Sequence, residues 1–259
     1  MTTPLGLFAR LFQRPVHVSA TNIFTRMISS GVQALAYSMN LDTREPVAMV
    51  LPLPVAPGSG EHAVTFVDLS AEPKLFEDLA KLFEIQQPLA RKGGLQFPSR
   101  SAPTLVVHKV GSFVASYVPT RADFARLDPR FRLPEVLFDA VPHYTDYGFA
   151  VFQLEPGKVT VHPMALTFPT RESGKLFFPT VHVHDGTFHE RAKFDHALYF
   201  QTPRCTELPK TAPYGGFEGD AIGWIEPSKD YAGLIVPKQA MLRRTLHGKR
   251  ANEDTWITA

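Results

Sequence analysis

The residues best suited to chemistry lie between Leu176 and Phe200. Asp185-Gly186 predicts a two-residue hairpin turn, because both central positions of that turn favour a positive φ, which Gly adopts freely and Asp tolerates. With this turn, His182 and His184 point to the same side of one strand, and His189 on the returning strand lies opposite His182. Opposed residues have Cβ atoms about 5 Å apart, so three imidazoles converge on one point.

A metal ion is the ligand that three converging imidazoles predict. Neutral imidazole binds Zn, Fe, Cu or Ni, and a catalytic site uses about three protein ligands and an open position for water or substrate. His162, on the preceding strand, or His196 can replace His189 as a ligand if the register slips by one residue. Glu190 and Asp195 are the candidate catalytic proton carriers, or they orient the imidazoles. The leading interpretation is a metal-dependent enzyme, a hydrolase or oxygenase, with Zn or Fe as cofactor and a small molecule or peptide as substrate.

The same alternation of residues has two other interpretations. His182, His184 or His196 could serve an active site that uses no metal. Alternatively, Val181, Val183 and Phe188 form the buried face and the histidines are polar positions facing solvent. The chain is then a non-enzymatic protein-binding or assembly module that uses a Phe- and Pro-rich surface, with 20 Phe and 23 Pro in the sequence.

The histidine segment resembles part of the first cupin motif. Gly174, His182, His184 and Glu190 come in the order of that motif, with wider spacings and over a small part of the chain. The resemblance serves as an analogy for histidines that project from a β-sheet. A Rossmann fingerprint, a phosphate loop, a His-Glu-x-x-His zinc helix and a serine nucleophile elbow are all absent from the sequence.

The bulk composition narrows the class of protein further. The 27 Lys and Arg nearly balance the 25 Asp and Glu, so bulk charge favours neither nucleic acid nor an anionic membrane. A single cysteine, Cys205, excludes an intramolecular disulfide and a four-thiolate zinc site. Arg10 and Arg14 interrupt the N-terminal apolar run, and no window of about 18 apolar residues predicts a membrane span. We therefore expect a cytoplasmic protein.

Short apolar runs between turn residues predict an α+β fold dominated by antiparallel sheet, with meanders, hairpins and two or three packed helices. We expect one domain over residues 1–259. A helix is predicted to open with Glu72 and Pro73, capped by Ser70, and to continue to Phe83 through apolar residues at helical spacing. A shorter helix is predicted from Thr120 to Leu127. Hairpins are predicted within residues 32–55, and the strands within 149–200 are expected to be neighbours in one sheet.

The two ends of the chain are expected to lie outside this sheet. Residues 1–30 are predicted to form a peripheral segment, in which the apolar residues of Leu5 to Phe12 dock on the body, fray or contact a partner. Residues 238–259 are predicted to form a helical tail on the spacing of Met241, Leu242 and Leu246. This tail carries the basic residues Arg243, Arg244, Lys249 and Arg250.

Overall fold

The computed structural model describes residues 16–83, 108–110, 113–133, 135–183, 187–203, 221–224 and 230–259. The large sheet has seven strands in the order β11 (Ala221–Trp224), β12 (Ala240–Ala251), β10 (Arg191–Gln201), β1 (His17–Ser29), β2 (Val32–Thr43), β8 (Gly157–Pro169) and β4 (Thr65–Val67). The small sheet has four, in the order β3 (Val47–Leu53), β7 (Gly148–Leu154), β6 (Phe113–Val118) and β5 (His108–Val110). A two-stranded sheet pairs β13 (Thr255–Thr258) with β9 (Lys175–Phe178).

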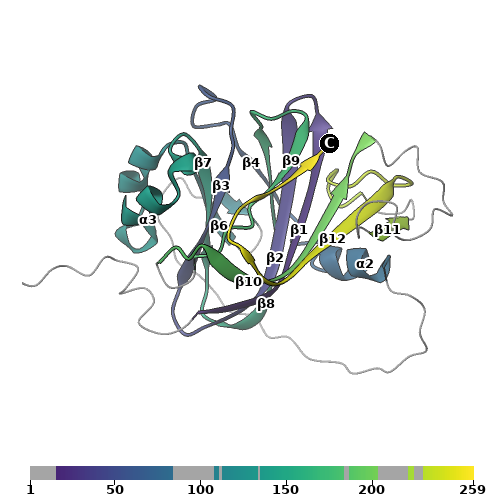
Figure 1. The fold of residues 1–259 in the computed structure, drawn as a ribbon, viewed down its shortest axis with the longest axis horizontal. Coiled ribbons are helices and arrows are strands. Elements are labelled where there is room, and N and C mark those ends of the chain that lie inside the picture. Colours follow the sequence, from purple (N-terminus) through teal and green to yellow (C-terminus); the bar gives the residue numbers. More distant parts are fainter. Residues whose placement is uncertain are drawn as a thin grey trace, which may run out of the picture.

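The helices are short and lie on the outside of the two main sheets (Figure 1). Beside the small sheet lies α3 (Glu135–Ala140), and α2 (Leu75–Lys81) lies at the other side of the molecule, against the large sheet. The 3-10 helices are η1 (Arg121–Arg126), η2 (Pro129–Phe131) and η3 (Pro142–Tyr144). These elements confirm the predicted α+β class with mainly antiparallel sheet. Both predicted helices exist, but α2 begins at Leu75 rather than at Glu72 and its N-cap is Lys74 rather than Ser70, whereas η1 follows Thr120 as predicted.

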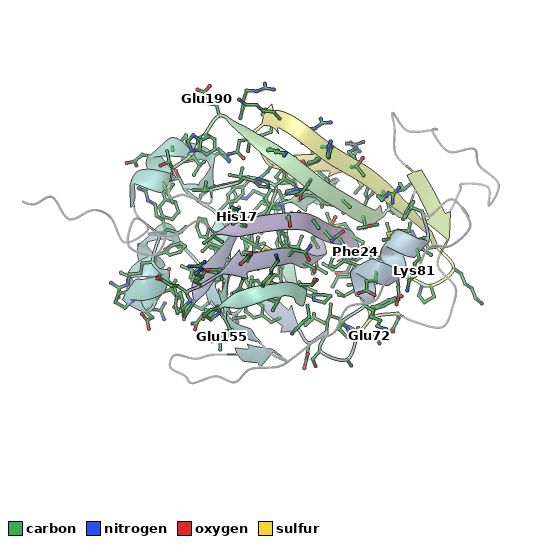
Figure 2. The ribbon with its side chains drawn as sticks, turned by 90° about the horizontal axis from the view of Figure 1, so that it is seen from below. His17, Phe24, Glu72, Lys81, Glu155 and Glu190 are labelled. Atoms are coloured by element: carbon green, nitrogen blue, oxygen red, sulfur yellow. The ribbon has the colours of Figure 1, made fainter. Side chains whose placement is uncertain are left out.

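Strand β1 lies in the middle of the large sheet, parallel to β10 and antiparallel to β2. Its successive side chains Ile23 and Phe24 are 0% exposed, because both faces of the sheet are covered. Ile23 belongs to the core cluster between the two main sheets, and Phe24 belongs to the cluster beneath α2. Figure 2 shows Phe24 on this central strand. The prediction that residues 1–30 are peripheral is therefore wrong for residues 17–29.

The face of the large sheet beneath α2 includes three small side chains beside larger ones such as Phe24. Ala34, Ala36 and Ala165 are buried there. Small residues on a sheet leave room for a helix to approach closely, and α2 fills that room with Leu75 and Leu79. The apolar stripe that predicts this helix is therefore core.

The predicted strands exist, but most of their predicted pairings do not. The chain passes from β2 in the large sheet to β3 in the small sheet, and from β7 in the small sheet to β8 in the large one. Within residues 149–200 the strands lie in three different sheets, so the predicted meander is wrong. Alternation of apolar and polar residues gives a strand its two faces but does not choose its neighbour.

The C-terminal segment is extended rather than helical. Residues 240–251 form β12, which pairs with β10 from Arg191↔Ala251 to Phe200↔Leu242, and residues 255–258 form β13. Leu242 and Leu246 lie on the same side of β12 because their separation is even, so their spacing suits a strand as well as a helix. Pairing with β10 decides between the two. No helix in the described ranges has the length and apolar character needed to cross a bilayer.

Candidate functional site

The predicted histidine hairpin is wrong. Strand β9 pairs with β13, and β10 pairs with β1 and β12, so the two strands that should form the hairpin have different partners. His182 lies in the connection between β9 and β10, outside any strand. His184 and the predicted turn Asp185-Gly186 lie outside the described residues.

Two of the predicted metal ligands, His182 and His196, nevertheless lie in contact. Their Nε2 atoms are 2.8 Å apart, and their ring centroids are 4.5 Å apart. Phe194 stacks on His182 at 4.7 Å between centroids. Two imidazole nitrogens at this distance form one N–H···N hydrogen bond, in which one ring donates and the other accepts. His196 is only 2% exposed, so this hydrogen bond lies at the edge of the core.

The distance between these rings is too short for two ligands of one metal ion. Nitrogens bound to the same tetrahedral zinc at about 2.0–2.1 Å stand roughly 3.3 Å apart. His189 is exposed, and its backbone carbonyl accepts a hydrogen bond from Asn252. The described residues contain no group of three His, Cys, Asp or Glu able to hold a metal ion. The prediction of a metal-dependent enzyme, and of metal binding by this cluster, is therefore wrong.

The two predicted proton carriers lie apart from one another. Asp195 on β10 accepts a hydrogen bond from the backbone N–H of Ala20, at 2.7 Å from Oδ2. Ala20 has a φ of 51° and lies where the β1–β2 register shifts, so the Asp195 carboxylate satisfies a donor in an irregular part of β1. Glu190 is exposed at the rim where β10 begins (Figure 2). Catalytic roles for Glu190 and Asp195 remain predictions.

Asn252, which the sequence analysis did not select, fixes the connection that carries His182. Its Oδ1 accepts from the His182 N–H at 2.7 Å, and its Nδ2 donates to the carbonyls of His182 and His189 at 2.8 and 2.9 Å. A carboxamide offers the same donor and acceptor as a peptide unit, so Asn252 replaces a neighbouring strand. Its sequence neighbours carry no signal for this role, because its partners lie about 70 positions away.

Asp254 holds the same connection two residues further along the chain. Its Oδ1 accepts from the N–H groups of Thr180 and Val181 at 2.9 and 3.2 Å, and Oδ2 accepts from the Tyr144 hydroxyl at 2.5 Å. Burial raises the pKa of Asp254 to about 6, although these hydrogen bonds act in the opposite direction. Burial also raises the pKa of Tyr144, and the negative charge of Asp254 adds to that effect.

The connection held by Asn252 and Asp254 forms one wall of an apolar pocket of about 170 Å³. Pro179, Val181, His182 and Val183 contribute to this wall. The other walls come from Val16 and Val18, from Tyr37, Met39 and Leu41 of β2, from residues 47–52 of β3 and from residues around α3. The pocket therefore lies where the two main sheets meet, and its shape depends on how the connection is held.

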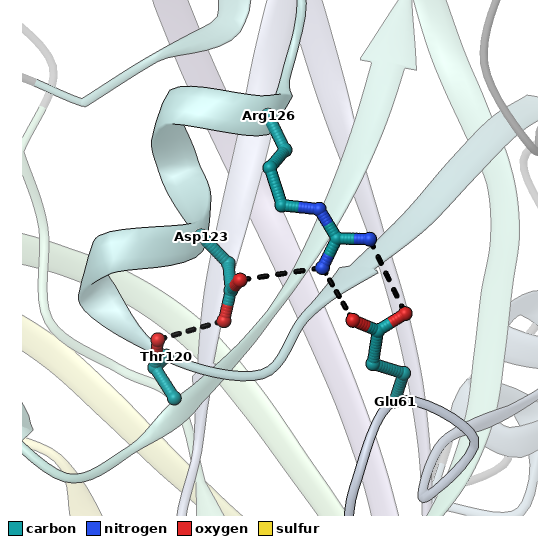
Figure 3. Close-up of polar contacts among 4 residues, drawn as sticks. All are labelled: Glu61, Thr120, Asp123 and Arg126. Carbon is teal, nitrogen blue, oxygen red and sulfur yellow. Dashed lines mark hydrogen bonds and ion pairs between the residues drawn. The ribbon is translucent and has the colours of Figure 1, made fainter.

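An exposed ion-pair network ties η1 to the loop that follows β3 (Figure 3). Arg126 donates through both terminal nitrogens to Glu61 and also to Asp123, while the Thr120 hydroxyl donates to Asp123 at 2.7 Å. The hydrogen bond and charge of Arg126 lower the pKa of Glu61, and the Thr120 hydroxyl is the largest cause of the lowered pKa of Asp123. These groups are solvent-exposed and form no enclosed site.

These features define a class of β-rich protein with two main sheets and a connection from β9 to β10 that side-chain hydrogen bonds hold in place. The described residues contain no three-ligand metal group. No family model and no curated protein matches the sequence. The fold is similar to that of baculovirus P35, with a TM-score of 0.51 and 13% identity over 95% of this chain and 98% of that chain. This similarity gives the chain a P35-like fold.

Two further structures of the same viral protein resemble this chain less closely. Mutated baculovirus P35 after caspase cleavage has a TM-score of 0.48 and 15% identity, over 93% of this chain and 99% of that chain. The P35 chain of a caspase-8/P35 complex has a TM-score of 0.46 and 13% identity, over 93% and 96%.

Proposed function

We propose that this chain is a non-enzymatic protein-binding module whose partner is a protease of the caspase class. The observation that carries the proposal is the similarity of its fold to baculovirus P35 across nearly the whole of both chains. P35 itself has been seen in complex with caspase-8 and, in mutated form, after caspase cleavage. The proposal replaces the enzyme interpretation with the alternative of a non-enzymatic module that binds another protein.

The positions of the predicted catalytic and metal-binding residues support a binding role. His182 and His196 hydrogen bond to each other, and Asp195 holds a backbone N–H of β1. These side chains make contacts within the folded body, and a binding surface that is already ordered loses less conformational entropy when a partner binds. We propose the cytoplasm as the compartment, because a chain with a single cysteine suits reducing conditions.

A titration of active caspases tests the proposal. Increasing amounts of the purified chain are added to caspase-8, the protease seen with P35, and to other caspases, and the hydrolysis of a fluorogenic peptide is measured. We expect residual activity to fall with each addition and the protease to co-elute with the chain in size-exclusion chromatography. Mass spectrometry of the chain after incubation then identifies any peptide bond that the protease has cut.

The controls separate specific binding from general interference. A cysteine protease of papain type receives the same additions, and its activity should not change. The proposal is contradicted if every caspase tested keeps full activity in a large molar excess of the chain and none co-elutes with it.

A further inference from the structure

The apolar pocket between the two main sheets is open to the segment that precedes β1. Val16 and Val18 line the pocket together with residues of β2 and β3. Val16 is also the first described residue, so residues 1–15 join the folded body at the wall of the pocket. Residues 1–15 are therefore held close to the pocket by their covalent link to Val16.

Residues 1–15 contain an apolar stripe close to this junction. Leu7, Phe8, Leu11 and Phe12 have the spacing of one face of a helix, with Arg10 outside that face. Phe12 precedes Val16 by four residues, and a chain spans at most about 3.6 Å per residue. Its ring therefore stays within roughly 15 Å of the pocket wall.

We propose that the pocket binds residues 5–12 of the same chain and that the ring of Phe12 fills it. A cavity of about 150 Å³ accommodates a benzene molecule, so a volume of about 170 Å³ suits one phenyl ring. A short linker between a segment and its site raises the effective concentration of that segment, typically to the millimolar range. This advantage favours the segment of the same chain over that of a second copy. The inference does not depend on caspase binding, since it concerns contacts within one chain.

The reactivity of a cysteine placed in the pocket tests this inference in the full chain. Met49 lines the pocket and is half-buried, and the chain with Cys205→Ser and Met49→Cys has one thiol, whose rate of reaction with a small maleimide is measured. We expect the added substitution Phe12→Asp to raise this rate at least roughly tenfold, since a charged side chain is expelled from an apolar pocket. Adding a synthetic peptide of residues 4–14 should then restore the protection.

Matched controls identify the cause of any change in rate. Gln13→Asp adds the same charge one residue away and should leave the rate unchanged. A thiol at Val159, which is 45% exposed on β8, should react equally fast in all variants. Thermal unfolding confirms that Phe12→Asp leaves the body folded. Equal Met49→Cys rates with and without Phe12→Asp overturn the inference. Protection that increases with protein concentration also overturns it, because the segment would then come from a second copy.

Discussion

The carboxyl group of Asp254 has a raised pKa, and the hydrogen bonds of its neighbours explain how it is accommodated in the core. Two backbone N–H groups and the Tyr144 hydroxyl point at its oxygens, so the ion is hydrogen-bonded although its burial disfavours charge. The pKa of about 6 lies above the ordinary value of 3.8. Between these two values the folded chain binds a proton that the unfolded chain does not. The stabilisation from this proton is fully present below pH 3.8 and is lost as the pH rises through 6.

The substitution Asp254→Asn should therefore change how stability depends on pH. Asparagine keeps an oxygen for Thr180 and Val181 but does not ionise. We expect the wild type to gain stability relative to this variant by about 2 to 3 kcal/mol as the pH falls from 7 to 4. Urea unfolding of both proteins at several pH values measures this difference. A wild-type advantage that stays constant across this range contradicts the assignment.

Asp123→Asn is the matched control, and it should show the opposite sign. The pKa of Asp123 is lowered, chiefly by its hydrogen bond with Thr120, so its contribution is present at neutral pH and is lost as the pH falls through its folded pKa. Because Asp123 is held in an exposed network, the effect of this variant should be small. The pair of variants distinguishes a raised from a lowered carboxyl pKa in the same protein.

At the scale of elements, three side-chain amides make the pair of backbone hydrogen bonds that a neighbouring strand would otherwise make. Asn252 pairs with the backbone of His182, Gln201 pairs with that of Val236, and Gln33 pairs with that of Phe177. In each case the amide accepts from the N–H and donates to the carbonyl of one residue. Each amide thereby joins a strand, or the end of one, to a segment that pairs with it by no strand ladder.

Substituting Gln33 tests the importance of these amide contacts. Its Nε2 donates to the Phe177 carbonyl at 2.8 Å, its Oε1 accepts from the Phe177 N–H at 3.0 Å, and the side chain is 0% exposed. Gln33→Met leaves both buried backbone groups without this partner, so we expect a loss of about 2 to 4 kcal/mol in the free energy of unfolding. Gln153→Met on β7, where the glutamine is only half-buried, should cost less. Equal losses in both variants contradict the assigned role.

The sequence predicts the elements of this fold better than their arrangement. The alternation in residues 32–55 and 149–168 gives real strands, because a strand with two different faces carries that pattern itself. The partner of most strands depends on residues far away, and so the hairpins predicted within residues 32–55 and around Asp185-Gly186 fail. The candidate site follows the same rule. His182 and His196 are indeed neighbours, but through Asn252 and the pairing of β10, which leave no local signal.

At the scale of the whole molecule, the two core clusters share one sheet. Ile23 and Phe24 are adjacent in β1 and belong to different clusters, so loss of β1 disrupts both. A single domain over residues 1–259 remains a prediction, and it implies one cooperative unfolding transition. We expect the denaturant curve from far-UV circular dichroism to coincide with that from fluorescence, where Trp256 packs on Phe177 at 4.8 Å between ring centroids. Separate midpoints would instead indicate two units that unfold independently.

The place of β1 between β2 and β10 also affects how the chain is synthesised. The ribosome completes β2 soon after β1, but Asp195 of β10 emerges 175 residues after Ala20. Throughout that interval one side of β1 has unpaired peptide groups next to apolar side chains, and such an edge pairs readily with other chains. The order of translation therefore leaves this edge of β1 open to pairing with another copy of the chain until β10 has been made.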